Sequence, residues 1–384
     1  MTPRVTVLLA VKDGERYVRG AVESVLEQTY GDFELLVVDD ASTDATPQIL
    51  ASFSDPRIRV VRNKRNLGQV PSLNLGLAQA RGEYVARLDA DDACRPERLA
   101  RQVEQLDADG RVGLVGTWME IVGERDQRLG WLRKALHDYV DFLYHTLIMR
   151  VYVSHPSAMY RREPVLALGG YDETTAPAED KDLWRKLALE RWDARIVPEP
   201  LVVYRLHPGQ LSQTQAAHQR EVDGLSQDRF LAALAPQTPP TPVRLLLASD
   251  PRTWQHDPRR QLDGLEAVLG GARTILRLGD DEARRLELRV AARLLAVART
   301  RPWHPAARVL GAYALARLPA ESKRRARASY AAALATTPLL AALRRSGRLV
   351  ADRADAVPVL RGLRGPARHS RLARSLYGKL LGTE

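Results

Sequence analysis

Residues 81–92 read RGEYVARLDADD, a short apolar run that ends on the three aspartates Asp89, Asp91 and Asp92. The run has the length and composition of a buried β-strand, and residues 95–106, RPERLARQVEQL, follow it as a helix pattern that Pro96 opens. Carboxylates at the end of a buried strand are costly unless a positive charge lies among them. The stretch therefore predicts a strand that delivers acids to a ligand site.

The same alternation of strand and helix patterns extends toward the N-terminus. Strand patterns cover 5–11, 32–40 and 58–63, and helix patterns lie between them and in 71–80. This order indicates an α/β fold with a mostly parallel sheet and helices on both faces, in which ligands bind at the carboxyl ends of the strands. We therefore expect Asp39 and Asp40, which end the 32–40 pattern, to share one crevice with the three acids after position 88.

The length of 384 residues suits two domains. Residues 1–213 hold the α/β alternation and a mixed strand and helix region, 214–242 read as a helical extension with a Pro-rich linker, and 243–384 read as a basic helical region rich in Ala, Leu and Arg. A single cysteine, Cys94, excludes an internal disulfide. No run reaches the roughly 20 apolar residues of a membrane span, and the N-terminal run is too short for a signal peptide.

The excess of positive over negative charge lies in the C-terminal part of the chain. Residues 301–384 carry 17 Lys and Arg and 4 Asp and Glu, whereas the whole chain has a net charge of +11. Three interpretations stay open for this part: contact with an anionic membrane surface, nucleic-acid binding, and a solvated helical face. It contains few aromatic residues and no nucleic-acid motif, so we do not expect a nucleic acid as partner.

Three groups of polar residues are candidates for chemistry. Asp89 and Asp91, at i and i+2 after a strand, suit a hard cation such as Mg²⁺ or Mn²⁺, although a polar loop before a helix would look the same. Asp39 and Asp40 suit carboxylates that accept a hydrogen bond from a ring N–H or a ribose hydroxyl, and they equally suit a turn or a helix cap. Glu179 and Asp180, before the helix pattern of 181–192, suit either a cap with a favourable helix dipole or a general base.

Two histidines lie beside predicted turns. His155 stands in VSHPSAMYRRE (153–163) and His207 in VYRLHPGQLS (203–212). Each fits a surface or hydrogen-bonded residue, and each equally fits a metal ligand or a phosphate contact.

Taken in order, these stretches resemble family 2 glycosyltransferases, whose fold is called GT-A. The stretches are VTVLLAVKDGERYVRGAVESVLEQTYGDFELLVVDDASTDAT (5–46), NLG (66–68), GEYVARLDADD (82–92), HPSAMYRRE with GGYDE (155–173), AEDKDLWRKLA (178–188) and YRLHPGQLS (204–212). The resemblance covers residues 4–212 and leaves 243–384 without a counterpart. It implies that 1–213 form a GT-A glycosyltransferase domain.

The resemblance also implies roles for particular residues. The nucleotide-sugar pocket would include Ala10, Val11, Lys12, Asp40, Asn66, Asp89 and Glu179. Asp91 would be the first metal ligand, with Asp89 and His207 beside it, and Asp180 would be the catalytic base. One departure is that the first strand ends on Ala-Val-Lys-Asp, where the family commonly has Pro-Val-Tyr-Asn, so a tyrosine that stacks on the base is missing.

The implied activity is the inverting transfer of a sugar from a nucleoside-diphosphate sugar, with a UDP-sugar favoured, to an acceptor hydroxyl. The implied cofactor is Mn²⁺ or Mg²⁺, and the implied acceptor is a glycan or a lipid-linked glycan of a bacterial cell envelope or exopolysaccharide. The expected location is the cytoplasm, and contact with the inner face of the cytoplasmic membrane stays open. The alternatives are a nucleotidyltransferase, whose Gly-rich basic loop the stretch AVKDGERY (10–17) does not provide, and a non-catalytic sugar-nucleotide-binding protein.

Overall fold

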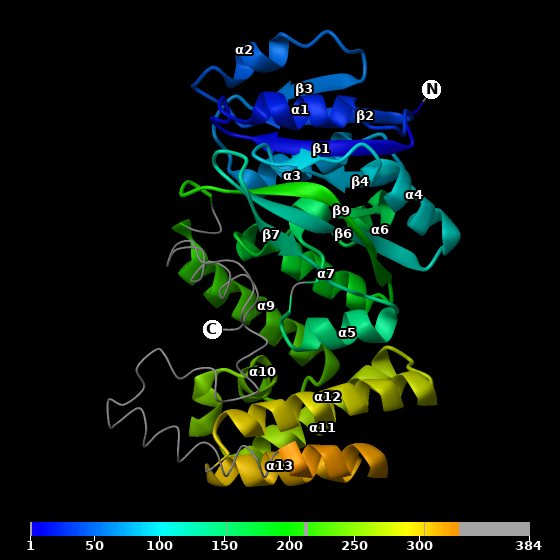
Figure 1. The fold of residues 1–384 in the computed structure, drawn as a ribbon, viewed down its shortest axis with the longest axis vertical. Helices are drawn as coiled ribbons and strands as arrows, with labels where there is room; N and C mark the ends of the chain where they lie inside the picture. Colours follow the sequence, from blue (N-terminus) through cyan, green and yellow to red (C-terminus); the bar gives the residue numbers. More distant parts are fainter. Residues whose placement is uncertain (1, 151, 211–213, 303, 330–384) are drawn as a thin grey trace. The chain divides into compact units, whose positions relative to one another are not determined.

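The computed structural model of the chain describes residues 2–150, 152–210, 214–302 and 304–329 (Figure 1). The chain divides into two compact units, one of residues 1–244 and 267–282 and the other of residues 245–266 and 283–384. Residues 330–384, which make up most of the basic C-terminal segment, lie outside the described residues. The predicted membrane contact of this segment therefore falls largely outside them as well.

One sheet dominates the first unit, with the strand order β3-β2-β1-β4-β8-β6-β9-β5 and with β7 paired to β6. The first four strands in this order run parallel, as do β6 and β9, while β8 runs antiparallel between β4 and β6. The strands are β1 (Val5–Val11), β2 (Phe33–Asp39), β3 (Ile58–Arg62), β4 (Tyr84–Arg87), β5 (Ala93–Cys94), β6 (Val112–Gly123), β7 (Arg128–Leu132), β8 (Met159–Arg161) and β9 (Asp193–Leu206).

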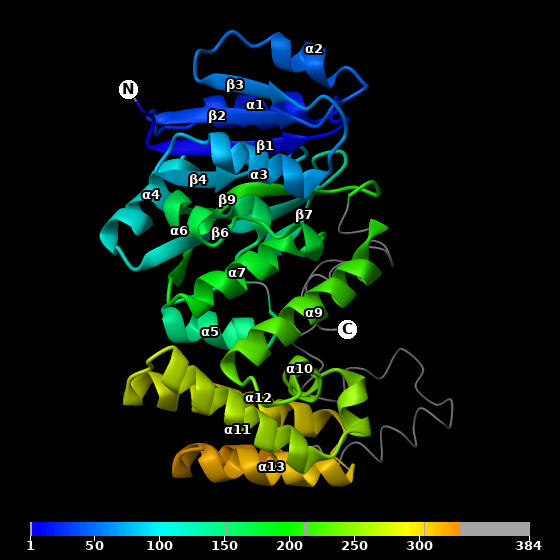
Figure 2. The ribbon, with the colours of Figure 1, turned by 180° about the vertical axis from the view of Figure 1, so that it is seen from behind.

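Helices cover both faces of this sheet, as Figures 1 and 2 show from opposite sides. The helices of the first unit are α1 (Val18–Leu26), α2 (Thr46–Ala51), α3 (Gln69–Gln79), α4 (Arg98–Ala108), α5 (Tyr139–Leu147), α6 (Arg162–Ala167), α7 (Glu179–Leu189) and α9 (Ala216–Leu234). Residues 155–157 and 173–175 form single 3-10 turns. The expected α/β architecture with a mixed second half is therefore confirmed.

The side chains of β1 show how the two faces are filled. Val7 and Leu9 belong to a core that includes Val22 of α1 and Leu99 of α4. Leu8 points the other way, where a Cβ added to Gly76 of α3 would lie 2.2 Å from it. Alternation along a strand sends successive residues to opposite faces, so an apolar run such as β1 requires helices on both.

The remaining helices are α10 (Pro240–Ala248), α11 (Pro258–Ile275), α12 (Asp280–Thr300) and α13 (Pro305–Arg317), with a 3-10 turn over Pro251–Gln255. The second unit buries a layer of small and branched apolar side chains that includes Leu246, Leu265, Leu294, Ala298 and Leu310. The expected Pro-rich linker overlaps the first residues of α10, and the predicted boundaries at 213 and 242 stay predictions. Among the described residues, no helix combines the length and the apolar character that crossing a membrane requires.

Candidate functional site

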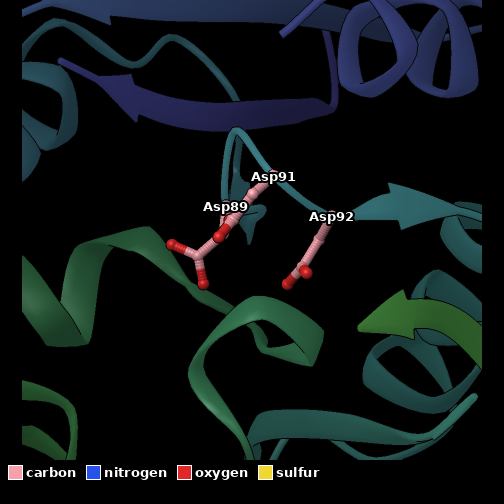
Figure 3. A group of neighbouring side chains, drawn as sticks. All are labelled: Asp89, Asp91 and Asp92. Atoms are coloured by element: carbon pink, nitrogen blue, oxygen red, sulfur yellow. The ribbon is translucent and has the colours of Figure 1, made fainter. Parts of the chain in front are cut away.

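The three acids of the DADD stretch lie in the turn between β4 and β5, and their side chains leave it on the same side (Figure 3). One carboxylate oxygen from each of Asp89, Asp91 and Asp92 lies within 4.8 Å of the others. One Asp92 oxygen, Oδ1, accepts a hydrogen bond of 2.9 Å from the backbone N–H of Arg205. The other, Oδ2, is buried and has no hydrogen-bond partner among the described residues.

The end of β9 closes on this turn. His207 Nε2 lies 2.9 Å from Asp91 Oδ2, and the His207 ring packs against the ring of Tyr17 at 5.3 Å between centroids. The Arg205 side chain donates to the carbonyl oxygen of Asp91 at 3.1 Å. The structure thus brings together Asp91 and His207, which the resemblance implies as ligands of one metal ion. It also places Asp92 in the same cluster as Asp89 and Asp91.

A buried cation lies under the acids. Arg87, the last residue of β4, is fully buried, and its Nη2 lies 2.6 Å from Asp89 Oδ1. The sequence predicts a positive charge among these acids in the form of a metal ion, and Arg87 is a cation that this prediction does not include. The available signal is an arginine inside an otherwise apolar strand pattern, two residues before the first acid.

Burial shapes the ionisation of the acidic turn. Burial raises the pKa of Asp89, and the positive charge of Arg87 opposes that rise. Burial, together with the charges of Asp91 and Asp89, raises the pKa of Asp92 well above its usual range. Carboxylates crowded in this way are stabilised in their charged form by a cation. A site with three such acids and a buried, unpartnered carboxylate oxygen fits a hard divalent ion with oxygen ligands.

Glu179 and Asp180 form the first turn of α7. The residue before the helix is Ala178, with no side-chain cap, so the expected cap by Asp180 is wrong. The other part of that alternative, acids favoured by the helix dipole, agrees with the acidic first turn. Glu179 is 4% exposed, and its Oε1 lies 3.9 Å from His155 Nδ1. Burial, with the charge of Asp180 next, raises the pKa of Glu179 to about 7. The remaining oxygen, Oε2, is buried without a hydrogen-bond partner among the described residues.

Electrostatic coupling joins this helix start to the acidic turn. The charge of Asp89 raises the pKa of Glu179 and that of Arg87 lowers it, although both effects are smaller than burial. Asp180, in the next position, is only partly buried, and burial raises its pKa. A second cation, Lys134, is electrostatically coupled to Asp180, since burial lowers the pKa of Lys134 and the charge of Asp180 raises it by a smaller amount. Its Nζ donates to Ser154 Oγ at 3.3 Å.

The predicted nucleotide pocket lies at the carboxyl ends of β1 and β2. Asp40 uses its carboxylate to hold the loop that follows β3, because it accepts hydrogen bonds of 2.8 Å from Asn63 Nδ2 and from the backbone N–H groups of Leu67 and Gly68. Asn66, in this loop, accepts a 3.1 Å hydrogen bond from the N–H of Gly68.

Residues 10–12 lie between the two groups of acids. Ala10 and Val11 end β1, which pairs with β2 on one side and β4 on the other, and Lys12 pairs with Asp13 at 2.6 Å. Asp40 follows β2 and Asp89 follows β4, so both come after the carboxyl ends of parallel strands that β1 separates. Their sharing of one crevice, like the role of each predicted donor-binding residue, stays a prediction.

Comparison with known proteins identifies the family of the chain. The model of the family described as "Glycosyl transferase family 2" matches residues 6–168. A relative from Haemophilus influenzae, named "Uncharacterized glycosyltransferase", is 32% identical over 238 residues, which are 57% of this chain and 70% of that protein. The chain therefore belongs to glycosyl transferase family 2 and is a glycosyltransferase.

Two further comparisons extend this result. The O-antigen biosynthesis glycosyltransferase WbnJ of Escherichia coli is 27% identical over 209 residues, 53% of this chain and 80% of that protein. The crystal structure of residues 1–349 of TarS from S. aureus, in complex with UDP-GlcNAc, is similar with a TM-score of 0.51 and 20% identity, over 84% of this chain and 92% of that one. This likeness confirms the GT-A fold.

Proposed function

We propose that the protein transfers a sugar from a nucleoside-diphosphate sugar to an acceptor hydroxyl, with inversion at the anomeric carbon, in the synthesis of a cell-envelope or extracellular glycan. The observation that carries the proposal is an electrostatic link, through Arg87, between two acidic groups. One is the turn of Asp89, Asp91 and Asp92, where Asp89 pairs with Arg87, and the other is the start of α7 with Glu179 and Asp180, where the charge of Arg87 acts on Glu179. The first group suits a diphosphate bound through a cation, and the second suits a base.

Asp180 is the proposed catalytic base. Glu179, its neighbour, is the more buried of the two and holds its proton up to about pH 7, whereas Asp180 is partly exposed at the helix start. A base must reach the acceptor hydroxyl, which comes from solvent, and must be ionised at the working pH. Asp180 meets the first condition better than Glu179 does. It would take the hydroxyl proton as the acceptor oxygen attacks the anomeric carbon and the nucleoside diphosphate leaves.

Asp91, Asp89 and His207 would hold a divalent cation, with Asp92 as a further oxygen ligand. The fit rests on the cluster itself: hard oxygen atoms within 4.8 Å of one another, with Asp92 Oδ2 buried and unpartnered in the described structure. When bound, Mn²⁺ or Mg²⁺ would supply positive charge to the departing diphosphate. His207, held by the Tyr17 ring, would keep Asp91 oriented toward this position.

A UDP-sugar is the favoured donor. The related TarS fragment is named as a complex with UDP-GlcNAc, and a second structure of it as a complex with UDP. The cell-envelope part of the proposal is supported by the names of relatives, which include the O-antigen enzyme WbnJ and the succinoglycan biosynthesis protein ExoO. Asp40, Asn66 and residues 10–12 would form the base pocket, and Glu179 would face the sugar.

A screen of nucleotides tests the proposal. UDP, GDP and dTDP, and their common hexose derivatives, are added to the full chain with and without Mn²⁺, and binding is followed by thermal shift and calorimetry. We expect one diphosphate to bind in a Mn²⁺-dependent manner and its sugar derivative to release that diphosphate on incubation. Failure of every nucleotide to bind would contradict the proposal, and binding without release from any donor would favour a non-catalytic sensor.

A further inference from the structure

We propose that Arg87 is a positioning residue of the donor site: it is a built-in cation that holds Asp89 and offsets the acids around it, so that an anionic diphosphate can enter. The inference deepens the proposed function and rests on it. It assigns a role to a residue that contacts no solvent and that would lie beneath the donor.

The position of Arg87 is central. It ends β4, which lies between β1 and β8 in the sheet, and its side chain is fully buried. Nη2 pairs with Asp89 Oδ1 at 2.6 Å, while none of the three guanidinium nitrogens has a hydrogen bond of good geometry within the described parts of the chain. A guanidinium carries five N–H donors, and here they lack well-aligned acceptors among the described residues. The attraction between the opposite charges of Arg87 and Asp89 is therefore the main interaction that holds the group.

The groups that face Arg87 are of two kinds. The charged ones are the carboxylates of Asp89 and Glu179. The others form a chain of rings: His155 Nε2 lies 3.0 Å from the hydroxyl of Tyr171, which lies 3.0 Å from the hydroxyl of Tyr160.

This chain of rings stays neutral. Burial, with the charge of Arg87 next, lowers the pKa of His155 well below its usual range, and burial raises that of Tyr171. Arg87 is thus a fixed cation in a neutral ring shell and is shared by the acidic turn and the start of α7.

The charge of Arg87 should have opposite effects on the binding of the two proposed ligands, a nucleoside diphosphate and a free divalent cation. A nucleoside diphosphate is an anion and meets Asp89, Asp91 and Asp92 on arrival, so a fixed positive charge beneath them favours its binding. A free divalent cation is attracted by the same acids and repelled by Arg87. Loss of the Arg87 charge should therefore weaken diphosphate binding and leave the binding of the free cation equal or tighter. A loss of fold in the turn would weaken both.

The test uses the full chain with Arg87 replaced by Met, Gln or Lys. Arg98 supplies a matched control, because it is also fully buried, yet its guanidinium donates to Gln102 Oε1 and to the carbonyl oxygens of Arg87 and Ala158 instead of pairing with an acid. Arg98→Met therefore removes a buried arginine without removing the counter-charge of Asp89. Circular dichroism checks the folding of every variant, and Arg87→Gln serves if Arg87→Met does not fold.

Two calorimetric titrations at pH 8 give the readout: Mn²⁺ alone, and UDP at saturating Mn²⁺ (or the diphosphate that the wild-type chain binds best). For Arg87→Met and Arg87→Gln we expect the diphosphate affinity to fall at least tenfold and the Mn²⁺ affinity to stay equal or rise. Arg87→Lys should recover most of the diphosphate affinity, and Arg98→Met should leave both affinities within about threefold.

Two results would overturn the inference. One is an unchanged diphosphate affinity in folded Arg87→Met or Arg87→Gln, and the other is a joint loss of Mn²⁺ and diphosphate binding, which would make Arg87 a support of the turn alone. Both differ from a failure of the proposed function, in which the wild-type chain itself binds no nucleoside diphosphate.

Discussion

Asp91 and His207 lie 116 positions apart in the sequence, yet His207 Nε2 and Asp91 Oδ2 are 2.9 Å apart. The contact joins the turn after β4 to the end of β9. Two residues before His207, the backbone N–H of Arg205 donates to Asp92 Oδ1 and makes a second link between the same segments. Because of these two contacts, the last residues of β9 border the acidic turn on one side. His207 Nε2 contacts Asp91 from this side, and we propose above that it is also a ligand of the metal ion.

Replacement of Asp91 by Asn should remove most of the cation-dependent donor binding. The change keeps the size of the side chain but removes its charge, and with it the preferred oxygen ligand for Mn²⁺ or Mg²⁺. We expect UDP affinity in the presence of Mn²⁺ to fall at least tenfold, and UDP affinity without metal to change little. Calorimetric titrations with and without Mn²⁺ give both values, and His207→Gln should show a smaller loss. An unchanged Mn²⁺-dependent affinity would remove Asp91 from the ligand set.

Replacement of Asp180 by Asn should separate binding from catalysis. Loss of a general base typically costs about 10²–10⁴-fold in rate, whereas the donor does not need the base in order to bind. We expect transfer, followed as UDP release with acceptor, to drop by that range while donor affinity stays within about threefold. Glu179→Gln is the matched control. Its rate should fall less than tenfold, because the Glu179 carboxyl already keeps its proton to about pH 7 and Gln resembles that neutral form. Similar losses in both variants would leave the base unassigned.

Much of the fold is readable in the sequence because its signals are local. The apolar runs of β1 and β2 and the helical spacing of Val18, Ala21, Val22 and Val25 each lie within a few residues of one another. The antiparallel insertion of β8 is not readable in this way, because a three-residue strand carries no periodicity and its place between β4 and β6 depends on long-range pairing.

The candidate site likewise has residues that can be predicted from the sequence and residues that cannot. The strand-end position of Asp91 indicates a cation ligand by itself, whereas the roles of Asp180 and His207 depend on the resemblance to a family. The structure brings Asp91 and His207 into contact. Arg87 is not readable in this way, because Glu179 and the rings of His155 and Tyr171 come from segments more than 65 residues away, and composition alone cannot show which acid a buried arginine faces. The bonds by which Asp40 holds a loop also cross between segments, since Asn63, Leu67 and Gly68 follow the next strand, 23 to 28 residues further along the chain.

The raised pKa of Glu179 predicts a stability that falls as pH rises. In the unfolded chain the carboxyl loses its proton near its ordinary value of 4.5, but in the folded chain it keeps the proton up to about pH 7. Between these values the folded state binds more protons, so each step up in pH favours unfolding. The difference of roughly 2.5 pKa units corresponds to a cost on the order of 3 kcal/mol above pH 7.

Glu179→Gln provides the measurement for this effect. Its free energy of unfolding relative to the wild-type chain should rise between pH 4.5 and 7 and then level off. Urea unfolding at several pH values, followed by the fluorescence of tryptophans such as Trp184 on the same helix, would show it. Parallel pH profiles for the two proteins would mean that Glu179 titrates normally in the folded state.

The attachment of α9 to α7 should depend on one buried acid. Asp223 is 5% exposed and pairs with Lys181 at 2.8 Å and with Arg185, itself 5% exposed. Asp223→Asn leaves both cations without their counter-charge, and breaking a buried pair in this way typically costs about 3–5 kcal/mol. The exposed pair between Arg229 and Asp172, which also fastens α9, is the control, because pairs of this kind contribute at most about 1 kcal/mol. Denaturant titrations should therefore show a large loss of stability for Asp223→Asn and a small one for Arg229→Gln. Equal losses would mean that Lys181 and Arg185 find other partners when Asp223 is neutral.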